Sequence, residues 1–259
     1  MTPIDRRSFL RLAALTVATA AAPRAAYATT NALPHRLLGK TGQSVSLLTL
    51  GGAHLGQDTT FTDQQMIRIV RRAVDEGITF LDNAWSYTEG LCEERMGKAL
   101  RDGYRDRIFL MSKVRDRTPT GARHQLEESL RRLQTDHLDL WQFHAIAERD
   151  DVKAVYNDGL LDVALEAREQ GRIRFIGFSG HTHPDLHLAM IEGGFPWDTV
   201  QMPVNLFDPH YLSFVEQVLP IAVQRGIGVI AMKSLGGTPG QLPQTGVVAA
   251  AECLRYAMS

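Results

Sequence analysis

The chain has 259 residues, 44% of them hydrophobic and 22% charged, a composition typical of globular proteins and not of disordered or collagen-like ones. Its 28 basic and 29 acidic side chains nearly balance, which argues against a surface built for nucleic acid. Two cysteines, Cys92 and Cys253, allow at most one disulfide and exclude a four-cysteine metal site. No apolar run reaches the roughly 18 residues that a membrane-spanning helix needs.

The N-terminal segment, residues 1–28, has the features of a twin-arginine export signal. Arg6-Arg7 precede the weakly apolar run 12–22, and Ala26-Tyr27-Ala28 supplies a small-residue cleavage site. We therefore expect recognition by the twin-arginine export machinery, cleavage after Ala28 and periplasmic residence. The alternative is a disordered or amphipathic arm. Residues 29–259 are expected to form one folded domain.

Short apolar runs recur along this domain at a nearly constant interval. Their starts are about 30 residues apart, the length of one strand–helix–strand crossover, and several such units in series predict a parallel sheet. The seven predicted strands are 47–50, 78–82, 108–113, 138–144, 173–178, 199–204 and 228–233.

Amphipathic stretches between the strands carry helix signals. Thr62 with Gln65 predicts a capping box ahead of a helix that Gly77 ends. Further helices are predicted to start at Thr120 and to cover 160–171, 215–226 and 245–258.

The sheet is expected to curl into a barrel. Residues 35–46 alternate around two glycines and predict a hairpin that would plug the barrel floor. A doubly wound open sheet is the competing architecture, but Gly51-Gly52 stands where its G-x-G-x-x-G signature would be. The predicted fold class is therefore an α/β protein of the (β/α)8 TIM-barrel type, with seven β/α units visible.

Polar residues follow the predicted strands at their C-terminal ends, where barrel enzymes place their chemistry. They are His54, Asp82, Lys113, His144, Ser179 and Gln201, with Tyr87 in the loop after Asp82. A tyrosine hydroxyl exchanges protons poorly near neutral pH unless a cation stands beside it, and Lys113 would provide that charge. Asp82 would keep Lys113 protonated, and His144 would donate a hydrogen bond to a carbonyl oxygen.

These residues lie in motifs that resemble the aldo-keto reductase superfamily. The motifs are 77–87 with Asp82 and Tyr87, 110–113, 138–144, 177–180 and 200–205 in that order, and the resemblance covers about residues 35–258. It implies reduction of an aldehyde or ketone with a nicotinamide cofactor, for which NADP(H) is favoured over NAD(H). Carried over, Tyr87 is the general acid, Lys113 lowers its pKa, Asp82 pairs with Lys113 and His144 orients the substrate.

The resemblance also implies a cofactor site. Ser179 and Gln201 would hold the nicotinamide carboxamide, and the loop with Leu235 and Gly236 would lie along the pyrophosphate. Met232 stands where other members stack an aromatic ring, so its packing is expected to be less specific.

The barrel is expected to be incomplete at its C-terminal side. An eighth strand would start near residue 258, and in the family this strand and the next helix supply most contacts to the adenosine 2'-phosphate. Two facing edges would then carry unpaired backbone groups. The chain is expected to be a fragment, or the hairpin or another chain covers the gap.

Two other functions remain open. A barrel that binds a nucleotide or partner without turnover, or an inactive fragment, would share this fold. A metal-dependent barrel hydrolase would use His181 and His183 as ligands, but that leaves Tyr87 and Lys113 without a role, and we expect no metal. The substrate beyond a small carbonyl compound and the oligomeric state are not predicted.

Overall fold

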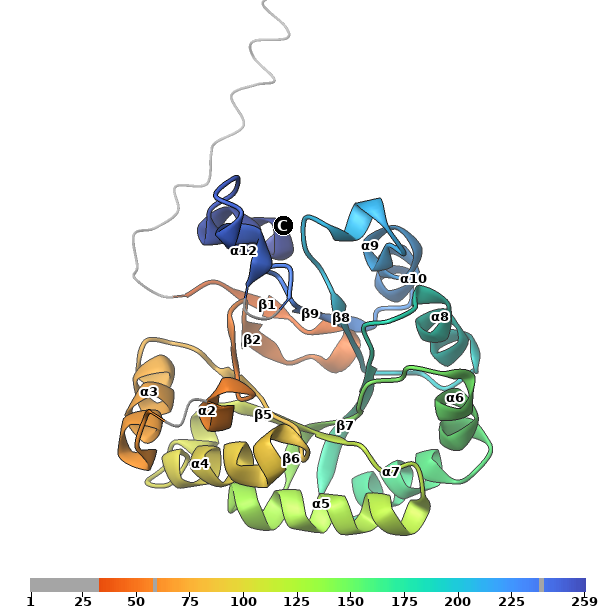
Figure 1. Cartoon of the computed structure of the whole chain (residues 1–259). Helices are drawn as coiled ribbons and strands as arrows, with labels where there is room; N and C mark the ends of the chain where they lie inside the picture. The colour runs from red at the N-terminus through yellow and green to blue at the C-terminus, as the bar shows by residue number, and fades with distance from the viewer. Residues whose placement is uncertain (1–32, 58–59, 238–239) are drawn as a thin grey trace, which may run out of the picture. The chain divides into compact units, whose positions relative to one another are not determined.

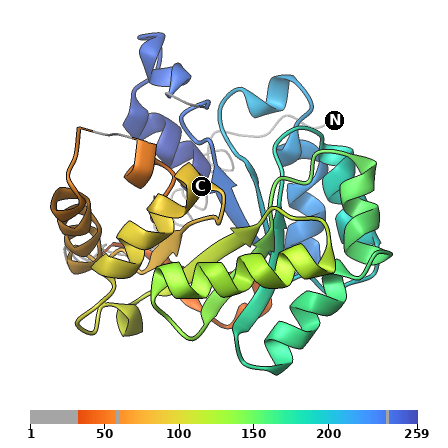
Figure 2. The same cartoon turned by 60° about the horizontal axis from the view of Figure 1, so that its bottom comes forward.

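The computed structural model describes residues 33–57, 60–237 and 240–259. Residues 33–259 form one compact unit, and the predicted export signal lies outside the described residues. Seven parallel strands follow one another in chain order and curl into an incomplete barrel, with helices on the outside (Figure 1, Figure 2). The strands are β3 Thr49–Gly51, β4 Phe80–Asp82, β5 Phe109–Val114, β6 Leu138–Phe143, β7 Ile173–Ser179, β8 Thr199–Pro203 and β9 Gly228–Met232.

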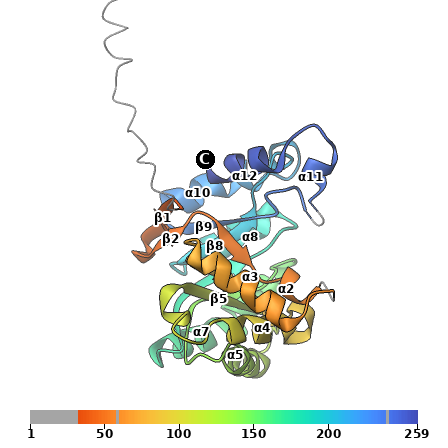
Figure 3. The same cartoon turned by 90° about the vertical axis from the view of Figure 1, so that its left-hand side faces the viewer.

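The predicted hairpin is confirmed and closes one end of the barrel. β1 (His35–Leu37) and β2 (Ser44–Ser46) pair antiparallel, and Figure 3 shows them at the opposite end from the short helices α2 (His54–Gln57) and α11 (Gln241–Gln244). Leu38 and Val45 from this region pack inside the barrel against strand residues that include Phe80, Met111 and Ile230. The hairpin thus forms the barrel floor, with Leu38 and Val45 as its buried apolar side chains.

Most helices lie between consecutive strands. Besides α2 and α11 they are α3 Asp63–Asp75, α4 Leu91–Ala99, α5 Pro119–Leu133, α6 Arg149–Tyr156, α7 Leu160–Glu169, α8 Pro184–Glu192, α9 Phe214–Gln217, α10 Leu219–Gln224 and α12 Ala250–Met258. The predicted capping box of α3 is present, because Thr62 and Gln65 exchange hydrogen bonds.

Three helix boundaries differ from the prediction. Thr118, not Thr120, caps α5, because Pro119 fits the first helical position, where no backbone N–H is needed. The predicted helix 215–226 is two helices, α9 and α10, with Pro220 in the first turn of the second. The predicted helix 245–258 starts only at Ala250.

The barrel interior changes from apolar to polar along β4 and β5. Side chains two residues apart share a face, so Phe80 precedes Asp82 and Met111 precedes Lys113 on the inner face. The apolar members join the lower core cluster. The polar members therefore collect at the C-terminal mouth of the barrel.

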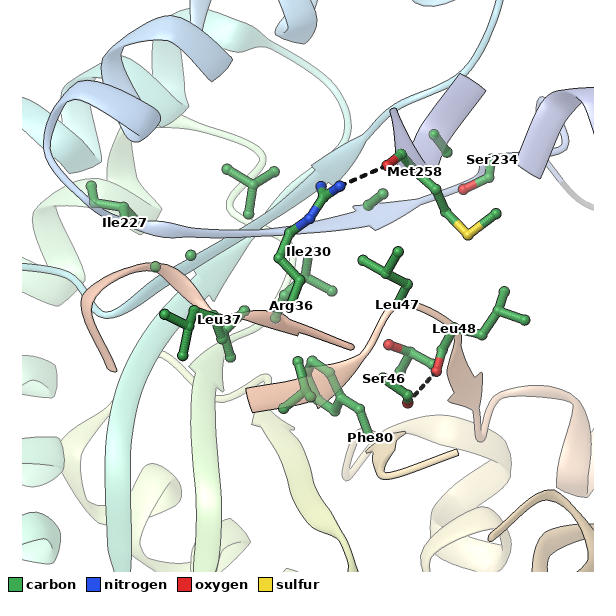
Figure 4. Close-up of a pocket in the computed structure, with 18 of the residues that line it drawn as sticks. Arg36, Leu37, Ser46, Leu47, Leu48, Phe80, Ile227, Ile230, Ser234 and Met258 are labelled. Carbon is green, nitrogen blue, oxygen red and sulfur yellow. Dashed lines mark hydrogen bonds between the residues drawn. The ribbon is translucent and has the colours of Figure 1, made fainter. Parts of the chain in front are cut away.

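The sheet is open between its first and last strands. β3 pairs only with β4 and β9 only with β8 among the described strands. A cleft of about 420 Å³ lies here, lined by the hairpin, β9 and α12 (Figure 4). Arg36 Nη2 donates across it to the carbonyl oxygen of Met258 at 3.0 Å. No predicted catalytic residue lines this cleft.

Candidate active site

Asp82 and Lys113 meet at the mouth of the barrel from neighbouring strands. Asp82 is the last residue of β4, and Lys113 is in β5. The side chain of Lys113 is 1% exposed, and its Nζ donates to Asp82 Oδ1 and, at 2.8 Å, to the carbonyl oxygen of Asn83. An ammonium group withdrawn from water in this way needs such partners.

Tyr87 reaches the same ammonium from the loop after β4. Its hydroxyl lies 3.4 Å from Lys113 Nζ, within hydrogen-bond distance. Nζ also lies 5.1 Å from the centre of the Tyr87 ring. The structure therefore brings the predicted Asp82, Lys113 and Tyr87 together.

The pKa values of this group reflect burial opposed by charge. Burial alone would lower the pKa of Lys113, but the charges of Asp82 and Tyr87 outweigh it and the pKa is raised. Burial raises the pKa of the Tyr87 phenol, and Lys113 opposes that shift without cancelling it. The Lys113 contribution has the predicted sign, but the net pKa of Tyr87 is raised and not lowered, because the half-buried ring loses water. Lysine and tyrosine are therefore both protonated near neutral pH.

His144 follows β6 and faces Tyr87. The two rings meet edge to face with centroids 5.7 Å apart, and His144 Nδ1 lies 3.4 Å from Ser86 Oγ. Burial, with the nearby Lys113 charge, lowers the pKa of His144 to about 2. The imidazole is therefore neutral near pH 7 and has an N–H to donate.

Ser179 and Gln201 lie side by side on β7 and β8, where they are register partners. Ser179 Oγ accepts the backbone N–H of Ala145 at 3.0 Å, and Gln201 Nε2 donates to Asp82 Oδ2 at 2.6 Å. The buried Oε1 of Gln201 has no hydrogen-bond partner in the described part of the chain. It is an acceptor held at the mouth beside the Asp82 carboxylate.

The other predicted cofactor residues lie at the end of β9. Met232 is its last residue and half-buried, and the loop with Leu235 and Gly236 follows. Gly236 has a φ of 83°, and a Cβ there would lie 2.8 Å from Leu242 Cγ. This turn therefore requires glycine. Within the described residues, no hydrogen bond links this loop to Asp82, Lys113 or Tyr87.

Two residues that contribute to this site were not predicted from the sequence. Asn83 accepts from Lys113 through its carbonyl oxygen, and Ser86 contacts His144. Both flank predicted residues within 77–87, so their position in that motif was the available signal. The Asn83 contact uses a backbone carbonyl, which every residue type has, so the identity of the residue could not predict it.

The two histidines considered as metal ligands, His181 and His183, lie in the segment that leads into α8. His54 begins α2, His183 precedes α8, and within 33–57, 60–237 and 240–259 no three His, Cys, Asp or Glu side chains are placed to hold a metal ion. Over the same ranges, each helix is too short or too polar to cross a bilayer. Cys92 and Cys253 are both buried and free.

Comparison with known proteins identifies the family. The family model for the aldo/keto reductase family matches residues 47–245. The uncharacterized oxidoreductase YrpG of Bacillus subtilis is 31% identical over 231 residues, 79% of this chain and 67% of that protein. The aldo-keto reductase YhdN of the same organism is 32% identical over 186 residues, 67% of this chain, but the match spans only 53% of YhdN.

Solved structures share the fold. The aldo/keto reductase from Klebsiella pneumoniae, crystallised with NADP and acetate, has a TM-score of 0.67 at 27% identity, with coverage of 80% of this chain and 70% of that chain. The matching family model covers well over half of this chain and includes every predicted site residue. The chain belongs to the aldo/keto reductase family.

Proposed function

We propose that the protein reduces an aldehyde or ketone to an alcohol with a nicotinamide cofactor, and that Tyr87 is the general acid. The observation that carries this proposal is the Tyr87 hydroxyl 3.4 Å from an ammonium that Asp82 and the Asn83 carbonyl hold in place. At the mouth of the barrel a phenol lies beside a buried cation and a neutral imidazole. Together these groups can orient a carbonyl oxygen and donate a proton to it.

The residues present fit a nicotinamide. Gln201 Oε1, buried and without a partner among the described residues, can accept a carboxamide N–H, and Ser179 adjoins it. Met232 offers a flexible apolar surface on the inner face of β9. When bound, the cofactor supplies the hydride that forms the new C–H bond. The neighbour solved with NADP supports NADP(H) as the cofactor here.

Each protein group has one task in this scheme. His144 donates from its neutral ring to the carbonyl oxygen and orients it. Tyr87 gives its proton to that oxygen as the carbonyl carbon gains the hydride. Lys113 then stabilises the phenolate, and Asp82 keeps Lys113 charged. The carbonyl thus gains one hydride and one proton and becomes an alcohol.

The experiment is isotope transfer. Purified protein is incubated with NADPH deuterated at the transferable position and a panel of aldehydes and ketones, and the alcohols are analysed by mass spectrometry. Deuterium on the carbinol carbon is expected. NADPH binding without transfer to any panel member would instead favour a non-catalytic nucleotide-binding barrel.

We also propose that residues 1–28 direct twin-arginine export and that the protein resides in the periplasm. Arg6-Arg7 and the site at Ala28 support this. Free NADPH is scarce there, so we propose that the cofactor is exported already bound. Fractionation of cells with the natural chain and an Arg6→Lys, Arg7→Lys variant tests export, and release of NADP(H) on denaturing the periplasmic protein tests preloading. Recovery of the natural chain from the cytoplasm would contradict export. A periplasmic protein that releases no NADP(H) on denaturation would contradict preloading.

A further inference from the structure

The loop that carries Tyr87 has an unfavourable backbone. Thr88 and Glu89 have φ values of 47° and 55°, and Gly90 follows with 93°. Side chains other than glycine are disfavoured in this left-handed region, and a β-branched threonine especially so. Contacts from outside the loop must therefore hold these residues in place.

Arg132 on α5 provides such contacts at both ends of the loop. Its Nη1 donates to the carbonyl oxygen of Trp85 at 3.3 Å and lies 3.4 Å from Glu93 Oε2. Trp85 precedes Tyr87 by two residues, and Glu93 lies in the first turn of α4 beyond the strained residues. One guanidinium nitrogen thus bridges the two ends of the segment that contains Tyr87.

The guanidinium group of Arg132 also fixes the side chain of Trp85. Arg132 Cζ lies 5.3 Å from the Trp85 ring centre, and Arg132 Nη2 contacts Glu128 Oε1 at 3.4 Å. Glu128 Oε2 in turn accepts the Trp85 Nε1–H at 2.8 Å. The Arg132 side chain is only 10% exposed, so these contacts are shielded from water.

Gly90 makes the approach of Arg132 possible. A Cβ at this position would lie 2.4 Å from Arg132 Cζ, closer than any real contact, besides requiring a positive φ. The bridge also reaches the strand that bears the catalytic lysine. Glu93 is fully buried and accepts from Ser112 Oγ at 2.6 Å, and Ser112 immediately precedes Lys113.

We propose that Arg132, through Trp85 and the buried Glu93, is the positioning residue that holds the Tyr87 hydroxyl at the Lys113 ammonium. Only the expected loss of kcat rests on the proposed function, because the position of the Tyr87 hydroxyl is itself a structural property. The polar and ring contacts of Arg132 are to Trp85, Glu93 and Glu128, and not to Tyr87 or Lys113, so it acts through the loop. A lysine could not replace it fully, since a single ammonium lacks the planar fork.

The test uses full-length Arg132→Met and Arg132→Lys, with Arg123→Met as the control. Arg123 lies on the same helix, is half exposed and pairs with Glu166 outside the loop. We expect Arg132→Met to lower kcat about 100-fold, as a displacement of about 1 Å can, with the KM for NADPH unchanged. Arg132→Lys should recover part of the loss, and Arg123→Met should match the natural protein.

A double variant separates positioning from general damage. If Arg132 acts through Tyr87, then Tyr87→Phe with Arg132→Met is no slower than Tyr87→Phe alone. An equal loss in both backgrounds, or an unchanged kcat in Arg132→Met, would overturn the proposal. Should Arg132→Met fail to fold, the same comparison is made with Arg132→Lys.

A crystal structure of Arg132→Met gives a readout independent of turnover. The Tyr87 hydroxyl is expected beyond hydrogen-bond distance of Lys113 Nζ. If the hydroxyl is displaced but Tyr87→Phe has the same kcat as the natural protein, the result supports positioning and refutes the proposed function. An undisplaced hydroxyl would refute positioning whatever the activity.

Discussion

Gln201 Nε2 donates a hydrogen bond to Asp82 Oδ2 at 2.6 Å, which joins β8 to β4 across the mouth of the barrel. The remaining carboxylate oxygen of Asp82 accepts from Lys113. One carboxylate thus links a residue proposed to hold the cofactor with the group proposed to protonate the substrate.

Replacing Gln201 should therefore affect cofactor binding and stability together. In Gln201→Leu, Asp82 loses a partner, which costs about 1–3 kcal/mol, and the proposed carboxamide acceptor disappears. We expect the Kd for NADPH to rise roughly tenfold, measured by fluorescence titration. Gln142→Leu is the control, since Gln142 Nε2 bonds Thr199 Oγ1 in the interior; it should lower stability without changing Kd. Equal Kd values for all three proteins would contradict the role of Gln201.

Removal of Lys113 should destabilise the fold, because Asp82 would remain buried without its counter-ion. For Lys113→Met we expect a loss of about 3–5 kcal/mol in the free energy of unfolding, measured by urea titration. The double variant Asp82→Asn, Lys113→Met should recover part of it, since no unpaired carboxylate remains. A double variant less stable than the single one would show that the pair is not coupled.

The raised pKa of Lys113 also sets a pH dependence. Its contribution to stability is complete below the unfolded pKa of 10.5 and is lost as the pH rises through the folded pKa. The loss of stability above that pH should therefore be smaller in the double variant than in the natural protein.

His144 should make the protein sensitive to acid. Its folded pKa of about 2 lies below the ordinary 6.5, so between these values the unfolded chain binds a proton that the folded chain excludes. Stability should fall as the pH drops below 6.5, by at most about 1.4 kcal/mol per pH unit from this group. His144→Gln should remove this part of the slope and retain that of His187, whose pKa burial lowers to about 4. Parallel slopes for the two proteins between pH 6.5 and 5 would contradict the shift.

Strand order and the site residues could be largely predicted from sequence. The 30-residue spacing predicted seven strands, and each observed strand overlaps its prediction, because each β/α unit places a strand buried on both faces before the helix that returns the chain. Asp82, Lys113 and His144 were found because strand ends converge at one mouth. The raised pKa of Tyr87 could not be predicted, because it depends on how much water its ring loses.

Contacts between distant helices carried no sequence signal. Nothing in the spacing of residues 85, 93 and 132 indicates that these residues touch. Two of the three helix boundaries that were predicted wrongly had a local signal in a proline. Pro119 marks the start of α5, and Pro220 marks the start of α10.

The open edges of the sheet should exchange amide hydrogens readily. Gly228 N–H donates to Asp198 and the Met232 carbonyl accepts from Val204, both on the β8 side, so by alternation Val229 and Ala231 direct their backbone groups toward the gap. We expect faster exchange at Val229 and Ala231 than at Val200 and Met202, which lie in β8 between two strands. Equal protection, measured by NMR, would mean that another segment or chain covers this edge.

The most direct test of the account compares kcat for NADPH-dependent carbonyl reduction in the natural protein and in Tyr87→Phe. This change removes only the hydroxyl that lies 3.4 Å from Lys113 Nζ. A general acid contributes about 10²–10⁴-fold, so kcat should fall by that factor while NADPH binding is unchanged. Equal kcat values would show that Tyr87 is not the proton donor.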